Sequence, residues 1–273
     1  MTVNETINEA ERRRWNDEHW TSAWPKRETM TSHVTPYLID AARPEPGHRV
    51  LDIGSGAGIA ALRAAAAVGP TGAVVGADIS APLVDYARRR AAAEAATTVR
   101  FVVRDVQQEP IDDEPFDVAI SQFGVMFFED PVEAFANIRS HVVPGGRLAF
   151  ACWQSMDRNP WFIGRAVAAF TAPPPAPAPG KSPTGPFAFA DADPVLSVLS
   201  DAGWSDPRSH PHQVEALISE EAIVDDGQLR FLGIPEEHLD EARAAVDRHL
   251  DPLRRDGDLI AAPLAFHIFT ATA

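Results

Sequence analysis

The sequence predicts an α/β protein with one mostly parallel sheet and helices on both of its faces. Short β-branched runs alternate with longer helical stretches, which is the order that produces parallel strands joined by crossover helices. The composition, 45% hydrophobic and 23% charged, is that of an ordinary globular protein. A chain of 273 residues is long enough to bury such a sheet within one domain.

Seven segments are predicted to be strands, five of them before residue 154. We expect these strands at residues 49–53, 72–78, 99–103, 116–120, 147–152, 212–218 and 263–270. Between them we expect helices at 59–68, 81–96, 132–142 and 193–202, a turn at 144–146, and an acidic helical stretch at 219–250. Ser80 is a good N-cap for the second helix, and Pro82 suits its first turn.

Charge and cysteine content exclude several classes of function. The net charge of −15 argues against a nucleic-acid surface, and the arginine runs at 12–14 and 88–90 are expected to lie on solvated helix faces. The single cysteine, Cys152, allows neither an intrachain disulfide nor a cysteine-based zinc site. No segment has the pattern of a signal peptide or a membrane span. We expect a cytoplasmic monomer or homodimer without a metal, a nucleic-acid partner or a membrane partner.

A binding site is predicted at the carboxyl ends of the strands, where open parallel sheets hold their ligands. Residues able to contact a nucleotide-like ligand stand at five of these ends: Gly54, Asp78, Asp105, residues 121–123 and residues 152–153. The agreement of five strand ends carries more weight than any one motif.

The glycine loop after the first strand differs from two better-known phosphate-binding loops. Its third glycine, Gly58, comes one position too early for a dinucleotide fingerprint, and Ile59 takes the place of the glycine expected there. No lysine follows, so the loop is no P-loop either. Gly54 and Gly56 still let backbone approach a ligand closely, because neither has a Cβ.

The acidic residue that ends the second strand favours an adenosine ligand. Asp78 lies 20 residues after Gly58, and a carboxylate there can accept both hydroxyls of a ribose. The alternative role, a cap for the next helix, is better filled by Ser80.

Together these segments resemble class I S-adenosylmethionine (SAM)-dependent methyltransferases. Residues 50–58, Val-Leu-Asp-Ile-Gly-Ser-Gly-Ala-Gly, match motif I of that family, D/E-x-G-x-G-x-G. Four further matching segments follow in the family's order, at residues 76–80, 104–106, 116–121 and 143–148. The subgroup most similar in pattern is the bacterial one that includes ubiquinone/menaquinone-biosynthesis methyltransferases and many small-molecule enzymes. The resemblance implies a Rossmann-like sheet of seven strands with a small helical and Pro-rich cap.

The resemblance implies SAM as the cofactor, with S-adenosylhomocysteine (SAH) as its product, and assigns residues to each part. Residues on or near the methionine part are Trp24, Asp52, Gly54, Gly56 and Ser121, the last through its backbone. Asp78 is expected to bind the ribose, Asp105 the adenine amino group, and Ile79 and Val106 the two faces of the adenine. Trp20 and Trp24 share a helix face, and a simple core role for this pair stays open.

The methyl acceptor is expected beyond the fourth strand. Phe123, Met126, Phe127 and Trp153, with Trp161 as a further candidate, predict an apolar aromatic wall, and only one of the adjacent Phe127 and Phe128 is expected to face it. His33 is the best-placed candidate general base, although a capping or surface role is the alternative. Nothing near Cys152 indicates an activated thiolate.

We expect methyl transfer to the O, N or C atom of a small, hydrophobic or aromatic metabolite. Two alternatives stay open: a SAM-binding protein that catalyses a rearrangement or cyclisation, and a SAM-binding regulatory subunit. The whole of 1–273 is expected to form one domain, with cap helices at 1–48 and the SAM-binding half at 49–153. Lid or substrate insertions are expected at 154–190 and 219–261, and residues 191–218 and 262–273 complete the sheet. The Pro-rich segment 171–186 fits either a surface connection or part of a lid.

Overall fold

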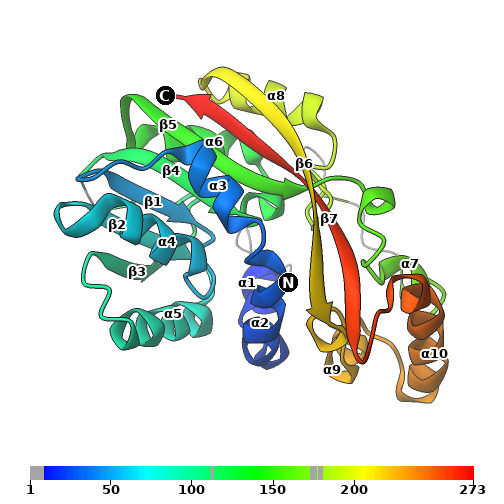
Figure 1. The fold of residues 1–273 in the computed structure, drawn as a ribbon. Helices are drawn as coiled ribbons and strands as arrows, with labels where there is room; N and C mark the ends of the chain where they lie inside the picture. The colour runs from blue at the N-terminus through cyan, green and yellow to red at the C-terminus, as the bar shows by residue number, and fades with distance from the viewer. Residues whose placement is uncertain (1–8, 112–113, 173–176, 178–180) are drawn as a thin grey trace, which may run out of the picture.

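A single seven-stranded sheet organises the protein (Figure 1). The computed structural model describes residues 9–111, 114–172, 177 and 181–273. The strands are β1 (Arg49–Ile53), β2 (Ala73–Asp78), β3 (Val99–Val103), β4 (Phe116–Gln122), β5 (Val142–Trp153), β6 (Ser205–Ser219) and β7 (Leu259–Thr272). Their order in the sheet is β3-β2-β1-β4-β5-β7-β6; the first five pair in parallel, and β7 is antiparallel to both of its neighbours. The predicted mostly parallel, Rossmann-like sheet is confirmed.

Helices cover both faces of the sheet (Figure 1). They are α1 (Glu9–Trp15), α2 (Glu18–Thr31), α3 (Thr35–Ala42), α4 (Ile59–Val68), α5 (Ala81–Ala93), α6 (Pro131–Ser140), α7 (Gly164–Val167), α8 (Ala192–Asp201), α9 (Asp226–Phe231) and α10 (Leu239–Leu250). Helices α3 and α4 pack against each other on one face, and α6 and α8 pack against each other on the opposite face. Among the described residues, no helix combines the length and the apolar character needed to cross a bilayer.

Three segments differ from the sequence-based expectations. Strand β6 begins at Ser205 and runs through Pro207 and Pro211, whereas the sequence predicted a strand only at 212–218. Because β6 is the edge strand, one side of its backbone needs no ladder partner, and prolines are tolerated there. The expected turn at 144–146 is instead an irregularity inside β5, where the register with β4 jumps.

The acidic stretch expected to be helical is broken into several short elements. Residues 219–250 contain α9, α10 and two 3-10 turns. The break between α9 and the second 3-10 turn holds Gly233, at φ 80°, and Pro235, two residues that end helices.

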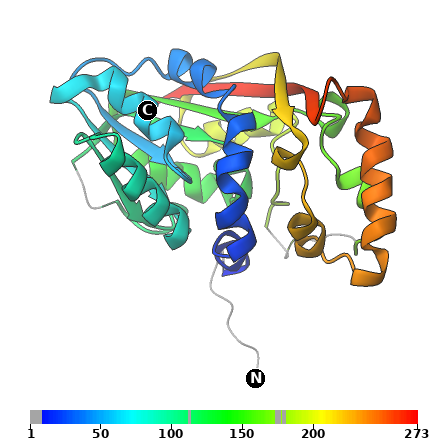
Figure 2. The ribbon, with the colours of Figure 1, turned by 60° about the horizontal axis from the view of Figure 1, so that its bottom comes forward.

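Strands β6 and β7 extend beyond the rest of the sheet. Strand β5 pairs with β7 only from Phe266 onward, whereas β6 stays paired with β7 back to Leu259. Residues 213–219 and 259–265 thus form a two-stranded ribbon. Residues 220–258, which include α9 and α10, connect its two strands. We call the ribbon and this connection, residues 213–265, the arm. Figure 2 shows α1 and α2 between the arm and the β1–β5 half of the molecule.

Candidate active site

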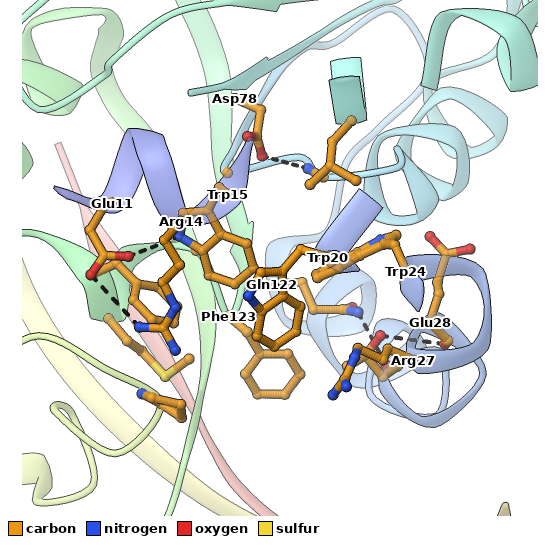
Figure 3. Close-up of a pocket in the computed structure, with 18 of the residues that line it drawn as sticks. Glu11, Arg14, Trp15, Trp20, Trp24, Arg27, Glu28, Asp78, Gln122 and Phe123 are labelled. Atoms are coloured by element: carbon orange, nitrogen blue, oxygen red, sulfur yellow. Dashed lines mark hydrogen bonds and ion pairs between the residues drawn. The ribbon is translucent and has the colours of Figure 1, made fainter. Parts of the chain in front are cut away.

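A cavity of about 440 Å³ lies where the strand ends, the N-terminal helices and the arm meet (Figure 3). Its residues come from the ends of β1, β2 and β4, from α1 and α2, from the segment around α7, and from the arm. A volume of this size is typical of a small-molecule site.

The glycine loop between β1 and α4 forms one side of the cavity. Gly54 and Gly56 adopt left-handed backbone conformations, with φ of 64° and 51°. A Cβ on Gly54 would lie 2.8 Å from the Cα of Gly124, and one on Gly56 would lie 3.1 Å from the indole of Trp24. The absence of a Cβ therefore lets the glycine loop, the segment at Gly124 and helix α2 pack closely together at the cavity. This packing is a second reason for glycine here, beside the predicted close approach of a ligand.

Asp78 fixes the glycine loop to the end of β2. One carboxylate oxygen accepts the N–H of Gly56 at 2.7 Å, and the other accepts the N–H of Ser80 at 2.8 Å. Burial raises the pKa of Asp78, and these backbone donors oppose that rise. The carboxylate is thereby held in one orientation on the cavity wall, with lone pairs left for a ligand.

Asp52 contributes a buried carboxyl group that makes no normal hydrogen bond within the described part of the chain. Neither of its oxygens has a hydrogen-bond partner among the described residues, and the residue lines the cavity. Burial raises its pKa to about 8; the nearby backbone N–H of Ala61 opposes this rise without making a hydrogen bond of normal geometry, and the charge of Asp78 adds to the rise. An orphaned buried carboxyl group beside a cavity fits a ligand that carries a cation.

The other predicted cofactor residues lie at the same edge of the sheet, with one difference. Trp24, Ile79, Asp105 and Val106 all line the cavity. Ser121 is buried and is not among the lining residues: its hydroxyl donates to the carbonyl of Ile53 at 2.7 Å and accepts from the N–H of Gly124 at 3.3 Å. Ser121 thus supports the segments that form the wall.

The predicted acceptor residues form an aromatic wall. Phe123, Met126, Phe127 and Trp153 all line the cavity. The rings of Phe123 and Trp153 are stacked at 3.9 Å, and Trp161 meets Trp153 edge-on at 5.2 Å. Phe123 has a φ of 64°, an unfavourable conformation for a residue with a side chain, and such strain is frequent at functional sites.

One expectation about this wall is wrong. Phe127 and Phe128 both line the cavity, although only one was expected to face it. Phe128 also packs edge-on against Phe135 in the core, so a single side chain serves both environments.

The N-terminal helices contribute residues that sequence reasoning missed. Glu11, Arg14 and Trp15 of α1, and Arg27 and Glu28 of α2, line the cavity together with Trp20, which the sequence had already singled out beside Trp24 (Figure 3). The expectation that residues 12–14 lie on a solvated face is wrong for Arg14, which is half-buried with its guanidinium 5.7 Å from the ring centroids of Trp15 and Phe127. Helix α1 is fixed over the site because the carbonyl of Trp15 accepts the hydroxyl of Ser80 at 2.7 Å. The helical spacing of residues 20, 24, 27 and 31 was the signal that could have found this face.

The structure does not bring the candidate base to the cavity. His33 is exposed, and no histidine of the described chain is among the lining residues. Cys152 is fully buried, and burial raises the pKa of its thiol, which agrees with the absence of an activated thiolate. Within the described ranges, no cluster of three or more His, Cys, Asp and Glu side chains could hold a metal ion. Of the Pro-rich segment, Thr171, Ala172 and Pro186 line the cavity, and residues 173–176 and 178–180 lie outside the described part of the chain.

The fold and the site together define a Rossmann-like protein built to bind an adenosine cofactor. Residues 50–146 match the family described as "Methyltransferase domain". The chain is 34% identical to aklanonic acid methyltransferase DauC of Streptomyces sp. (strain C5), over 41% of this chain and 51% of that protein. It is 36% identical to the ubiquinone/menaquinone biosynthesis C-methyltransferase UbiE of Ectopseudomonas mendocina, over 41% of this chain and 44% of that protein. The matched region therefore spans about half the length of these relatives.

Solved structures agree on the fold over a longer part of the chain. The YcgJ protein of Bacillus subtilis superposes with a TM-score of 0.59 at 18% identity, covering 88% of this chain and 98% of that one. The [4+2]-cyclase SpnF superposes with a TM-score of 0.53 at 19% identity, covering 88% of this chain and 79% of that one. Residues 50–146 therefore carry a methyltransferase domain, and the solved structures share its fold over most of the chain.

Proposed function

We propose that the protein transfers the methyl group of SAM to a small acceptor with an apolar or aromatic face. The observation that carries this proposal is a single cavity with two unlike sides. Buried acidic residues at the ends of β1 and β2 lie on one side, and the stacked pair Phe123–Trp153 lies on the other. Two relatives are named for methylation of aklanonic acid and for ubiquinone/menaquinone biosynthesis, which supports an acceptor that is a small molecule.

The residues at the strand ends fit the cofactor. Asp78 offers a fixed carboxylate for the ribose hydroxyls, and Asp105 with Ile79 and Val106 offers an adenine site. The orphaned carboxyl group of Asp52 and the unpartnered indole N–H of Trp24 fit the ammonium and carboxylate of the methionine part. SAM supplies a methyl group on a positively charged sulfur, which is already an activated leaving group.

The chain's own contribution is positioning and the exclusion of water. The aromatic rings of Phe123, Trp153 and Trp161 give the acceptor a rigid apolar surface. Residues of helices α1 and α2 line the cavity, and we propose that they limit the access of water and order the reacting atoms. With no histidine among the described lining residues, we propose that His33 is not the base and that acceptors of low pKa are preferred.

The setting of the reaction is also part of the proposal. The net charge of −15 disfavours a nucleic-acid substrate, and we propose a free small molecule in the cytoplasm as the acceptor.

Calorimetry and mass spectrometry test the proposal in turn. Calorimetric titration of the purified protein with SAH is expected to show one-to-one binding, and an absence of binding would overturn the proposal. Incubation with methyl-deuterated SAM and a panel of aromatic acids and phenols is then expected to give products that carry one labelled methyl group. An isomerised product with SAM unconsumed would overturn methyl transfer and favour a SAM-assisted rearrangement or cyclisation.

A further inference from the structure

Two arginines of the N-terminal helices face the cavity from opposite the strand ends. Arg14 of α1 and Arg27 of α2 both line it, and both guanidinium groups lie against Trp20 (Figure 3). Their Cζ atoms are 6.0 Å and 4.5 Å, respectively, from the centroid of that indole. Both guanidinium groups therefore lie within about 6 Å of one indole in a partly buried place.

Arg27 has no carboxylate partner within ion-pair distance among the described residues. Its Nη2 donates to the side-chain carbonyl of Gln228, which is neutral, and its buried Nε has no hydrogen-bond partner within the described chain. Burial lowers the pKa of its guanidinium to about 10, and the charge of Asp225 only partly opposes this. A half-buried arginine normally has an anion beside it, so the missing partner points to a ligand.

Arg14 repeats this pattern in a weaker form. Its Nε is also buried without a hydrogen-bond partner among the described residues. Its ion pair with Glu11 is long, at 3.9 Å, and the Glu11 carboxylate also accepts the indole N–H of Trp15 at 3.0 Å. The Arg14 guanidinium, which belongs to a lining residue, therefore has hydrogen-bond donor capacity that the described residues do not use fully.

The positions of the charges distinguish the acceptor side from the cofactor side. Asp52, Asp78 and Asp105 stand at the strand ends, where the adenosine and the positive charges of the cofactor are expected. Arg27 is held by Gln228 of α9, which belongs to the arm, whereas Trp24, one turn earlier on α2, packs on the glycine loop. The guanidinium of Arg27 thus points toward the arm, away from the glycine loop.

We propose that Arg27, with Arg14, binds an anionic group of the methyl acceptor, so that the acceptor is an apolar or aromatic organic anion, such as a carboxylate. The inference rests on the proposed methyl transfer and names the chemical class of its acceptor. The methionine carboxylate of the cofactor has the same chemistry and is the competing source of an anion for these arginines. The experiment must therefore measure the cofactor and the acceptor separately.

Two probes of equal ring size separate charge from shape: 2-naphthoate and 2-naphthalenemethanol. Each is titrated calorimetrically into protein saturated with SAH. The unmutated protein is expected to bind the naphthoate more tightly than the alcohol. Arg27→Gln is expected to weaken naphthoate binding by about tenfold or more, because a charge-assisted hydrogen bond is lost. The affinities for the alcohol and for SAH are expected to stay within about twofold.

Matched variants control for charge and folding. Arg230→Gln makes the same substitution in α9, on an exposed side chain paired with Glu236 outside the cavity, and is expected to change no affinity. Arg14→Gln is expected to weaken naphthoate binding by less than Arg27→Gln does. If Arg27→Gln does not fold, the loss of naphthoate affinity in Arg14→Gln tests the proposal instead. Arg27→Lys is expected to recover part of the naphthoate affinity, since it keeps the charge but not the planar fork.

Several outcomes would overturn the inference while leaving the proposed function intact. Loss of SAH affinity with naphthoate binding retained would assign Arg27 to the cofactor. An equal loss of affinity for both probes in Arg27→Gln would show that Arg27 only stabilises the packing of α2 against α9. An unmutated protein that binds naphthoate no better than the alcohol would show that the arginines recognise no acceptor anion. Failure to bind SAH would instead overturn the proposed function itself.

Discussion

The two walls of the cavity are built in different ways. The cofactor wall, formed by Asp52, Gly54, Gly56 and Asp78, comes from two adjacent strand ends and is held by backbone strand pairing and by backbone N–H groups that donate to the Asp78 carboxylate. The opposing wall, formed by Arg14, Trp20, Arg27 and Gln228, is held by side-chain contacts, one of which joins Arg27 to Gln228 across 201 positions of the chain. The difference teaches that residues at strand ends form one wall through local geometry, whereas the other wall depends on distant segments that meet across the cavity.

Removal of Asp78 is expected to have the largest effect, and it acts on the cofactor wall alone. Asp78→Ala removes a carboxylate that offers two charge-assisted hydrogen bonds to the ribose and anchors the N–H of Gly56. SAH affinity is expected to fall roughly 100-fold or more in calorimetry.

Asp85→Ala is the matched control, because this aspartate lies on α5 with its side chain 59% exposed. It is expected to leave SAH affinity unchanged. If Asp78→Ala bound SAH normally, the assignment of the cofactor wall would be wrong.

The packing of the glycine loop is expected to contribute the next largest effect. Gly54→Ala combines a left-handed φ of 64° with a Cβ placed 2.8 Å from the Cα of Gly124. The free energy of unfolding in urea is expected to fall by about 2–4 kcal/mol, from backbone strain plus the steric conflict.

Gly145→Ala separates these two contributions. Gly145 has a similar φ of 80°, but a Cβ there meets no atom within 4 Å. It is expected to lose only the strain, about 1–2 kcal/mol. Equal losses in the two variants would show that the contact between the β1 and β4 ends has no special importance.

Asp52 is expected to give the cofactor wall a pH dependence of smaller size. Its pKa of about 8 lies above the value of 3.8 for an unperturbed aspartate, so the folded state holds a proton that the unfolded state releases between about pH 4 and pH 8. The free energy of unfolding therefore falls as the pH rises through this window, by at most about 1.4 kcal/mol per pH unit from this group. Asp52→Asn is expected to lack this contribution, so that its stability relative to the unmutated protein grows with pH. Parallel stability curves at pH 5 to 7.5 would contradict the assignment.

The same protonation state makes a prediction about ligand binding. If the carboxyl group of Asp52 pairs with the ammonium of SAH, it must ionise on binding. Calorimetry at pH 7 in buffers of different ionisation enthalpy is then expected to show release of up to about one proton by the unmutated protein and less by Asp52→Asn.

The sequence placed Gly54 and Asp78 at the cavity because their positions follow directly from strand periodicity. A strand that ends in glycine or aspartate places that residue at the carboxyl edge of a parallel sheet whatever the rest of the chain does. Strand β6 was only partly predicted because prolines exclude a central strand, and nothing local shows that β6 lies at the edge. Arg14 was misjudged because an arginine run on a short polar helix has the same sequence pattern whether it faces solvent or a cavity.

By itself, the sequence determined the sheet, the glycine loop and the acidic residues at the strand ends, since each depends on neighbours within a few positions. Only the tertiary structure decided that α2 crosses the cavity and that Arg27 meets Gln228 of the arm, leaving His33 at the surface. It also decided that the carboxyl oxygens of Asp52 are buried without a normal hydrogen-bond partner in the part of the chain that the structure describes. Each of these contacts joins residues that lie far apart in the chain. A local sequence pattern cannot indicate which distant helix will cover a strand end.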